Sequence, residues 1–274
     1  MTPKPLAVQL FSLRERAQKD FVAVLKDVAA MGYKGVEPAG LWNIRPSQFR
    51  AILDDLGLEM YSSHSPWANP RNLGECMDIA HILKLDTIVC GYGPADFENM
   101  DAIKRTAEQT SKMAQELKKN GFTLFQHNHA FEFERLDGRL KYEIYKELCP
   151  EVMFQIDAYW STNFGEENAV ENVKKFADRT ILLHMKDGVL RQAKAEQTMV
   201  NGLLDRKIDL VPLGCGDMDI KGVIEAAPDT VRAVIVELDY CNIDMTEAIA
   251  KSYKYMTENG FALATNNLLQ GIKL

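Results

Sequence analysis

The residues best suited to chemistry are histidines and carboxylates at the ends of short apolar runs. Four of the five histidines and several acidic residues have this position: His64, His127, His129, His184, Glu37, Asp157, Glu237 and Asp239. Burying a charged side chain in such a run costs free energy unless the charge is paired or binds a metal ion. Imidazoles and carboxylates converging from several strands favour the metal ion.

Four of these residues come from four different predicted strands: His127, Asp157, His184 and Glu237. We expect them to ligate one divalent metal ion. Nitrogen and oxygen donors without sulfur suit Mn²⁺, Co²⁺, Mg²⁺ or Zn²⁺. The sequence does not choose among these metals.

The same region supplies candidates for proton transfer. Glu237, His127 and His129 are alternative general bases, since imidazole and carboxylate both accept protons near neutral pH. We expect both histidines to point into the fold, because residues two apart on a strand share a face. Lys186 is a candidate to stabilise a developing oxyanion, and a solvated ion pair with Asp187 is the alternative.

The elements that must position these residues recur along the chain. Runs rich in apolar and β-branched residues predict strands roughly 30 residues apart, the length of one βα unit. They cover 6–13, 35–38, 59–64, 87–91, 123–129, 153–159, 181–186 and 233–239. Continuous runs such as ILLHM and AVIVEL are typical of parallel strands buried on both faces.

Glycines mark where the intervening helices end. An amphipathic run, a glycine and a β-rich run follow one another around Gly32, Gly57, Gly121 and Gly260. Glycine accepts the left-handed backbone that closes a last helical turn. Eight such units predict a single-domain (β/α)₈ TIM barrel over 1–274, with its active site at the carboxyl ends of the strands. An open doubly wound sheet is the alternative, but its GxGxxG turn is missing after the first strand.

Composition narrows the partners. The 274 residues carry a formal net charge of −7, which disfavours a nucleic-acid partner. We find no apolar run of about 18 residues, so no membrane span is expected. The five cysteines form no CxxC pair, which predicts reduced thiols and favours a cytoplasmic protein. A leader removed from the N-terminus stays open as an alternative. The protein could also be a homo-oligomer. The long interval 188–219, which holds the unpatterned stretch 190–207, is predicted to be a loop that covers the substrate.

Six ordered motifs carry a family resemblance. They are GVEPAG at 35–40, HNHAFEF at 127–133, IDAYW at 156–160, LHMKDG at 183–188, PLGCGDMD at 212–219 and VELD at 236–239. Through them the chain resembles the xylose isomerase-like TIM barrel superfamily, in its sugar phosphate isomerase/epimerase branch. The resemblance implies a divalent metal, a small carbohydrate substrate, and ligands at the four positions named above.

One departure from the family shifts the expected chemistry. Many similar members carry a glutamate where His127 stands, and it forms a catalytic pair with the glutamate on the last strand. Because histidine replaces that glutamate, the resemblance argues less for an epimerase mechanism that uses two carboxylates. In offering histidines on this strand the chain is similar to inosose dehydratase, which favours a dehydratase or lyase. Glu132, just beyond, is a candidate replacement carboxylate.

Other polar and aromatic residues at or just beyond the predicted strand ends are candidates to contact substrate. The candidates are Glu37, His64, Glu132, Trp160 and Asp187. For Glu37 and His64 the alternative is packing or strand-end capping. Trp160, like Trp42 and Trp67, either stacks on a sugar ring or packs at the rim.

The resemblance leaves several functions open. The leading hypothesis is a metal-dependent isomerase or epimerase acting through an enediolate. The runner-up is a dehydratase or lyase acting on a keto sugar, an inosose or a 3-keto glycoside. An endonuclease IV-like nuclease and a noncatalytic sugar-binding barrel are alternatives of other classes. A phosphorylated substrate is not expected, because the loop PLGCGDMD carries two acidic residues that would repel phosphate.

Overall fold

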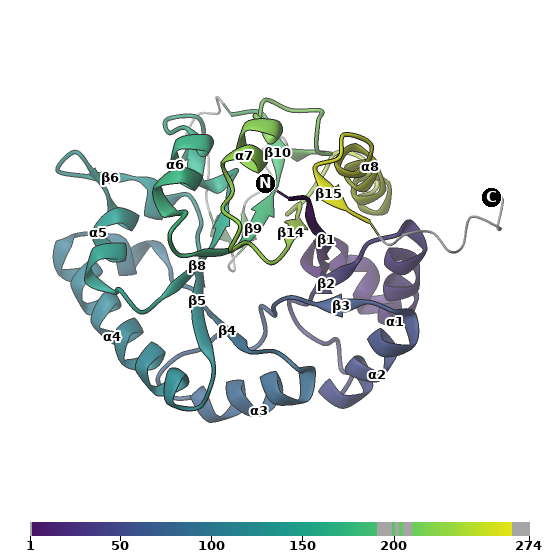
Figure 1. The fold of residues 1–274 in the computed structure, drawn as a ribbon, viewed down its shortest axis with the longest axis horizontal. Helices are drawn as coiled ribbons and strands as arrows, with labels where there is room; N and C mark the ends of the chain where they lie inside the picture. The colour runs from purple at the N-terminus through teal and green to yellow at the C-terminus, as the bar shows by residue number, and fades with distance from the viewer. Residues whose placement is uncertain (1, 191–198, 201–202, 205–209, 265–274) are drawn as a thin grey trace.

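The described chain forms a ring of parallel strands enclosed by helices (Figure 1). The computed structural model describes residues 2–190, 199–200, 203–204 and 210–264. Within the interval 188–219, predicted to cover the substrate, residues 191–198, 201–202 and 205–209 lie outside the described residues. In chain order the ring strands are β1 (Lys4–Gln9), β2 (Gly35–Glu37), β3 (Glu59–Met60), β4 (Thr87–Cys90), β5 (Thr123–His127), β8 (Met153–Asp157), β9 (Thr180–Met185) and β14 (Val234–Val236).

The strand order is that of a TIM barrel. Hydrogen-bonded neighbours run β3-β2-β1-β14-β9-β8-β5-β4, every pair parallel, and β15 (Ala262–Leu263) adds to β1. The chain after β3 joins the ends of this sheet. There the His64 amide donates to Pro38 O and the Ala68 amide to Val89 O, both at 2.8 Å. The predicted (β/α)₈ barrel is confirmed.

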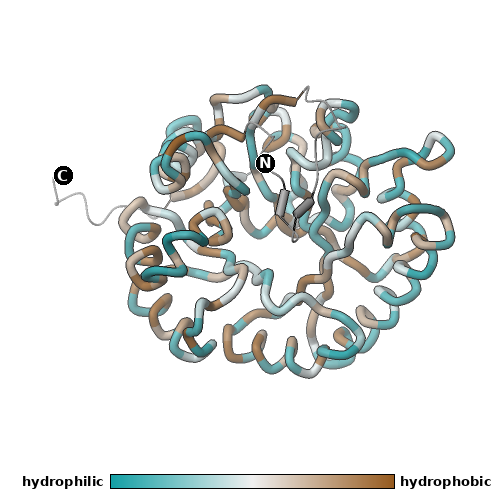
Figure 2. Tube along the Cα trace, turned by 180° about the vertical axis from the view of Figure 1, so that it is seen from behind, coloured by the Kyte–Doolittle hydropathy of each residue, from teal (hydrophilic) through white to brown (hydrophobic). Residues whose placement is uncertain are grey.

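Amphipathic helices cover the outside of the ring. They are α1 (Arg14–Met31), α2 (Pro46–Leu56), α3 (Leu73–Leu83), α4 (Met100–Lys119), α5 (Lys141–Leu148), α6 (Ala169–Phe176), α7 (Ile220–Ala226) and α8 (Met245–Glu258). Along their turns hydrophobic and hydrophilic residues alternate (Figure 2). In α4, for example, Ile103, Ala107 and Leu117 are buried. Gly32 ends α1 with a left-handed φ of 98°, as the sequence predicts.

Strand alternation builds the site on top of an apolar layer. Inside the barrel a small cluster separate from the main core includes Val89, Phe125, Leu182 and Ile235. Two residues further along three of these strands, the same face carries His127, His184 and Glu237. Apolar side chains therefore fill the lower barrel, and polar groups occupy the carboxyl ends.

Seven of the eight predicted strands are shorter in the structure than expected, and the last, predicted over 233–239, spans only Val234–Val236. The first, predicted over 6–13, ends at Gln9 and continues as a 3₁₀ helix, Leu10–Leu13. The Gln9 side chain accepts a hydrogen bond from the Phe11 amide at 3.1 Å, which turns the chain and brings Phe11 to the barrel mouth. The third, predicted over 59–64, pairs only at Glu59–Met60.

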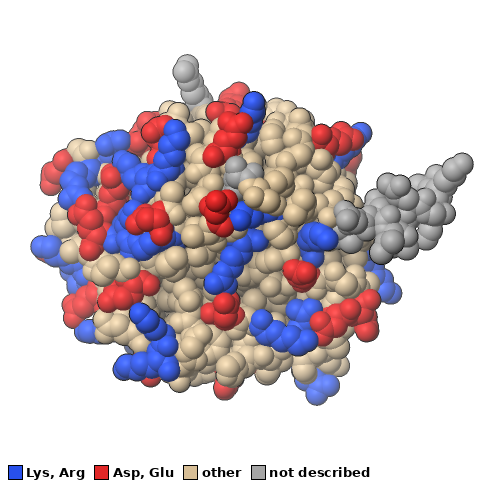
Figure 3. Space-filling model, in the orientation of Figure 1, with Lys and Arg blue, Asp and Glu red and all other residues tan. Residues whose placement is uncertain are grey.

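The surface is mixed in charge. On the face drawn in Figure 3, lysines and arginines alternate with aspartates and glutamates rather than gathering into one basic patch. Among the described helices, none combines the length and apolar character needed to span a bilayer.

Candidate metal centre and active-site cavity

The structure brings the four predicted metal ligands together. His127 ends β5, Asp157 ends β8, His184 lies on β9 and Glu237 follows β14. One ligand atom from each lies within 4.8 Å of the others, and all four residues are buried. His184 Nδ1 lies 2.8 Å from Glu237 Oε2 and 3.9 Å from Asp157 Oδ2.

The hydrogen bonding of the Asp157 carboxylate indicates whether this group of residues fits a metal ion. Its Oδ1 accepts a hydrogen bond from the Trp160 amide at 2.9 Å. Its Oδ2 is buried and has no hydrogen-bond partner among the described residues, and Lys186 Nζ stands 3.4 Å away. A buried carboxylate oxygen left unsatisfied is costly, and a bound cation would satisfy it. The mixed imidazole and carboxylate set therefore fits a divalent ion.

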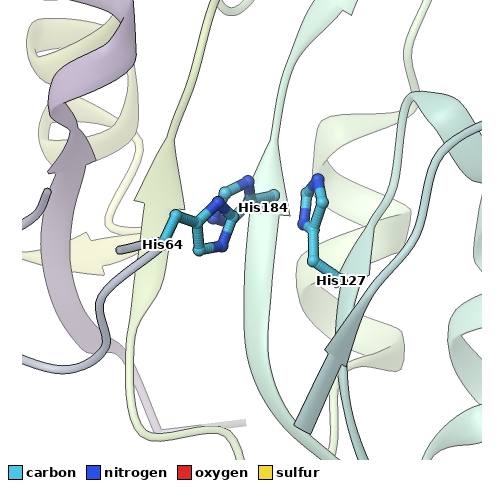
Figure 4. A group of neighbouring side chains, drawn as sticks. All are labelled: His64, His127 and His184. Carbon is cyan, nitrogen blue, oxygen red and sulfur yellow. The ribbon is translucent and has the colours of Figure 1, made fainter. Parts of the chain in front are cut away.

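A third histidine adjoins the ligands. Figure 4 shows His64, His127 and His184 gathered at the strand ends. The ring centroid of His64 lies 4.8 Å from that of His127 and 5.3 Å from that of His184. These three histidines form a second group close enough to share an ion. Two of its members also belong to the first group.

Glu37 lies beneath the ligands, inside the barrel. Its carboxylate is fully buried and accepts hydrogen bonds from Gln9 Nε2 and Gln155 Nε2, both at 2.6 Å, and from Ser62 Oγ. His184 Nε2 lies 2.6 Å from Glu37 Oε1. Glu37 is therefore turned toward His184, and it is absent from the described lining of the cavity over the metal ligands.

Gln155 orients two further imidazoles. Its Oε1 lies 2.7 Å from His64 Nε2 and 3.1 Å from His127 Nδ1, and an amide oxygen can only accept. Both nitrogens therefore carry hydrogen, and His127 keeps the lone pair of Nε2 for a metal ion or a proton. Sequence reasoning missed Gln155, Gln9 and Ser62. The available signal was spacing, because Gln155 stands two residues before Asp157 on one strand face.

Replacing Glu37 with glutamine should weaken metal binding about 10–100-fold, the usual cost of losing an outer partner of a ligating histidine. The carboxylate fixes the ring of His184 through Nε2 and leaves Nδ1 facing Glu237. Isothermal titration of metal-free protein with Mn²⁺ measures the change. An affinity equal to that of the unmodified protein would show that Glu37 does not orient the ligand.

Lys186 inserts its ammonium group among three carboxylates. Its Nζ lies 2.7 Å from Glu237 Oε2 and 2.8 Å from Asp239 Oδ2, besides the 3.4 Å contact to Asp157. Burial alone would lower the pKa of Lys186, but the three carboxylates outweigh it and raise that pKa. Lys186 thus points inward as a cation, and it does not form the solvated pair with Asp187.

Asp187 faces away from the cavity, contrary to its expected role as a substrate contact. Its Oδ2 accepts from the amides of Gly214 and Gly216, and its Oδ1 from those of Gly188 and Met218, at 2.9–3.1 Å. A Cβ on Gly216 would lie 2.2 Å from Asp187 Oδ1, so the close approach requires glycine. The amides of the PLGCGDMD loop thus bind the protein's own carboxylate.

A cavity of about 220 Å³ lies over the four candidate metal ligands. Its described lining is Phe11, Ala39, His64, Trp67, His127, His129, Trp160, Lys186, Glu237 and Asp239. Of the predicted substrate contacts, His64 and Trp160 line it. Trp67 joins them, whereas Trp42 packs on Phe21 with ring centroids 4.6 Å apart.

His129 lies just beyond β5 and faces the cavity. Its ring stands nearly perpendicular to that of His127, at 88° and a centroid distance of 5.1 Å, and stacks on Phe131. Burial and then the charge of Lys186 lower the pKa of His129 to about 4. Burial also holds the pKa of His127 well below its usual value. Both imidazoles are therefore uncharged at neutral pH.

Glu132 lies outside the barrel wall, so it does not serve as the replacement carboxylate in the cavity. Its Oε2 accepts from the His129 amide at 2.9 Å, and Gln126 Nε2 lies 3.5 Å from its Oε1. Burial is the largest influence on its carboxyl group and raises the pKa of Glu132 to about 8. The side chain is therefore protonated at neutral pH.

This raised pKa predicts a pH-dependent loss of stability. The folded protein binds a proton at Glu132 more tightly than the unfolded chain does. The contribution of this proton to the free energy of unfolding is complete below the ordinary glutamate pKa and is lost as pH rises through the folded-state pKa of about 8. Between pH 5 and pH 8.5 the free energy of unfolding should fall by on the order of a few kcal/mol more in the unmodified protein than in Glu132→Gln. Urea denaturation of both proteins at the two pH values measures this difference. Parallel pH profiles would contradict the assignment.

Comparison with known proteins identifies the family. Residues 25–258 match the model of the xylose isomerase-like TIM barrel family, so the chain belongs to that family. A sugar phosphate isomerase/epimerase from Parabacteroides distasonis is similar in structure, with TM-score 0.74, 22% identity, and 96% of each chain covered. Comparison with curated proteins finds no match.

Two other solved structures share the fold at lower identity. The probable 3-DHS dehydratase AsbF from Bacillus anthracis has a TM-score of 0.72 and 13% identity, covering 92% of this chain and 98% of its own. An L-ribulose 3-epimerase has a TM-score of 0.66 and 14% identity, with 94% of each chain covered. At these identities the likeness establishes the fold.

Proposed function

We propose that the protein is a divalent-metal-dependent enzyme that isomerises or epimerises a small, unphosphorylated carbohydrate by removing a proton next to a carbonyl. The observation that carries this proposal is the convergence of His127, Asp157, His184 and Glu237 under a cavity, with one buried carboxylate oxygen lacking a hydrogen-bond partner among the described residues. The family and its sugar-converting structural relatives support it.

The side chains around the cavity suit proton abstraction. A divalent ion held by the four ligands supplies Lewis acidity toward a carbonyl and its neighbouring hydroxyl. Glu237 and His129 line the cavity as candidate bases, whereas the free lone pair of His127, on Nε2, is used when His127 holds the ion. Although burial opposes it, Lys186 and His184 hold the pKa of Glu237 well below its usual value. The Lys186 ammonium stands beside them to stabilise negative charge on the substrate.

A dehydratase is the second candidate, and the pair of histidines favours it. His127 and His129 are adjacent, uncharged, and both line the cavity. An uncharged imidazole can accept the proton next to the carbonyl, and the imidazolium so formed can return that proton to the departing hydroxyl, which leaves as water. The structural similarity to a probable dehydratase is consistent with this alternative.

The loop at 212–219 favours an unphosphorylated substrate. Three of its amides, those of Gly214, Gly216 and Met218, already bind Asp187. A phosphate group would have to displace this buried carboxylate. The same side chain thus explains why the loop is rich in glycine without serving as an anion site for substrate.

Metal analysis combined with hydrogen exchange tests the proposal. Purified protein should contain about one divalent ion per chain, and incubation with keto sugars in D₂O should place deuterium beside the carbonyl of at least one of them, detected by NMR. Chelation should stop the exchange, and Glu132→Gln, a buried change outside the cavity, should not. Retained metal without exchange would favour a noncatalytic binding barrel. A protein that contains no divalent metal and catalyses no deuterium exchange would refute the proposed enzyme activity.

A further inference from the structure

A second cavity opens beside the one over the metal ligands. Its volume is about 280 Å³, and it is lined from within 12–16, after β1, and 239–245, after β14. Asp239 lines both cavities. Phe11 lines the first, and the guanidinium of Arg14, which lines the second, lies 4.2 Å from the Phe11 ring centroid. The two cavities therefore adjoin at Asp239 and at the contact between Phe11 and Arg14.

The size of the cavities argues that they act together. The first measures about 220 Å³ and the second about 280 Å³. Small-molecule sites usually measure about 300–1,000 Å³, so neither cavity reaches that range alone and the pair does. A ligand spanning both would place one part over the metal ligands and another between the starts of α1 and α8.

The charges of the second cavity select a neutral occupant. Its charged lining consists of two arginines and three carboxylates: Arg14, Arg16, Glu15, Asp239 and Asp244. Several are already paired, since Arg16 lies 2.7 Å from Asp27 and Asp239 lies 2.8 Å from Lys186. The excess of carboxylates disfavours a phosphate or carboxylate group. Hydrogen-bonding groups of both kinds suit hydroxyls.

The remaining lining is partly apolar. Leu13, Ile243 and Met245 stand among the charged groups. A sugar ring combines an apolar C–H face with hydroxyls at its edge, which matches such a mixed surface. A fatty chain would shield these charged groups from water, which costs free energy, and a polyanion would meet three carboxylates.

We propose that the second cavity binds a neutral sugar ring linked glycosidically to the ring held over the metal ligands, so that the substrate is a glycoside. This inference rests on the proposed function and specifies its substrate class. Asp239 is then the residue at the junction, because its carboxylate borders both cavities and its position is fixed by Lys186.

Binding measurements on matched sugars test the inference. Mn²⁺-loaded protein is titrated with maltose, cellobiose, lactose and sucrose and with their component monosaccharides. At least one disaccharide should bind about tenfold or more tightly than its monosaccharides. Ile243→Trp, which fills the second cavity, should bring that ratio close to one. Met245→Trp provides an independent filling variant in case the first does not fold.

An exposed isoleucine supplies the matched control. Ile82 on α3 is 44% exposed and does not line the second cavity, so Ile82→Trp should keep the disaccharide preference. Equal binding of every disaccharide and its monosaccharides would overturn the inference, as would a preference that survives both filling variants. Deuterium exchange with keto monosaccharides tests the proposed function separately, because it requires only the first cavity.

Discussion

Replacing Asp157 with asparagine is expected to lower metal affinity more than about 100-fold, beyond the 10–100-fold typical of outer-shell changes. The substitution is selective. Asparagine can still accept the Trp160 amide hydrogen bond now made by Oδ1, but it places an NH₂ group where Oδ2 stands. An NH₂ group donates hydrogen bonds and does not ligate cations. Mn²⁺ titration with a competing chelator measures the loss.

Glu132→Gln is the matched control for that substitution. It also converts a fully buried carboxyl group to an amide, but it lies outside the barrel wall. Circular dichroism should show both variants folded, with Mn²⁺ affinity lost only in Asp157→Asn. Equal affinities for the two variants would remove Asp157 from the ligand set.

Replacing Lys186 with methionine is expected to destabilise the metal-free protein by about 3–5 kcal/mol, the usual cost of breaking a buried ion pair. The change leaves Asp157, Glu237 and Asp239 without the ammonium that contacts all three. Added Mn²⁺ should restore much of the loss, because two of these carboxylates are proposed ligands. Urea denaturation in EDTA and in excess Mn²⁺ gives both values.

Lys141 provides the comparison for this variant. It is also buried, but it pairs with a single, more exposed carboxylate, Glu134, at 2.7 Å outside the barrel. Lys141→Met should cost less, and Mn²⁺ should stabilise it no more than the unmodified protein. If metal-free Lys186→Met is as stable as the unmodified protein, the carboxylates do not depend on this cation.

The convergence of the four candidate ligands could be predicted from sequence because strand periodicity fixes which side chains share the barrel mouth. His127, Asp157, His184 and Glu237 each interrupt an apolar strand at its carboxyl end, and parallel strands bring those ends together. The barrel itself followed from the same repetition. The spacing of these residues along the sequence was enough to place their side chains at one end of the barrel.

The roles of neighbouring polar residues could not be predicted in the same way. Glu37 and Asp187 stand at strand ends too, but hydrogen bonds made after folding turn one toward His184 and the other toward the 212–219 loop. Glu132 lies in the short 3₁₀ helix Phe131–Phe133 after β5 and contacts the His129 amide and the Gln126 side chain instead of the cavity. Such partners are distant in sequence, so no local pattern records them.

A crystal of the protein grown with Mn²⁺, measured for anomalous scattering near the manganese edge, tests the central claim most directly. We predict one strong peak within bonding distance of His127, Asp157, His184 and Glu237. A peak held by His64, His127 and His184 away from Asp157, or no peak at the barrel mouth, would contradict it.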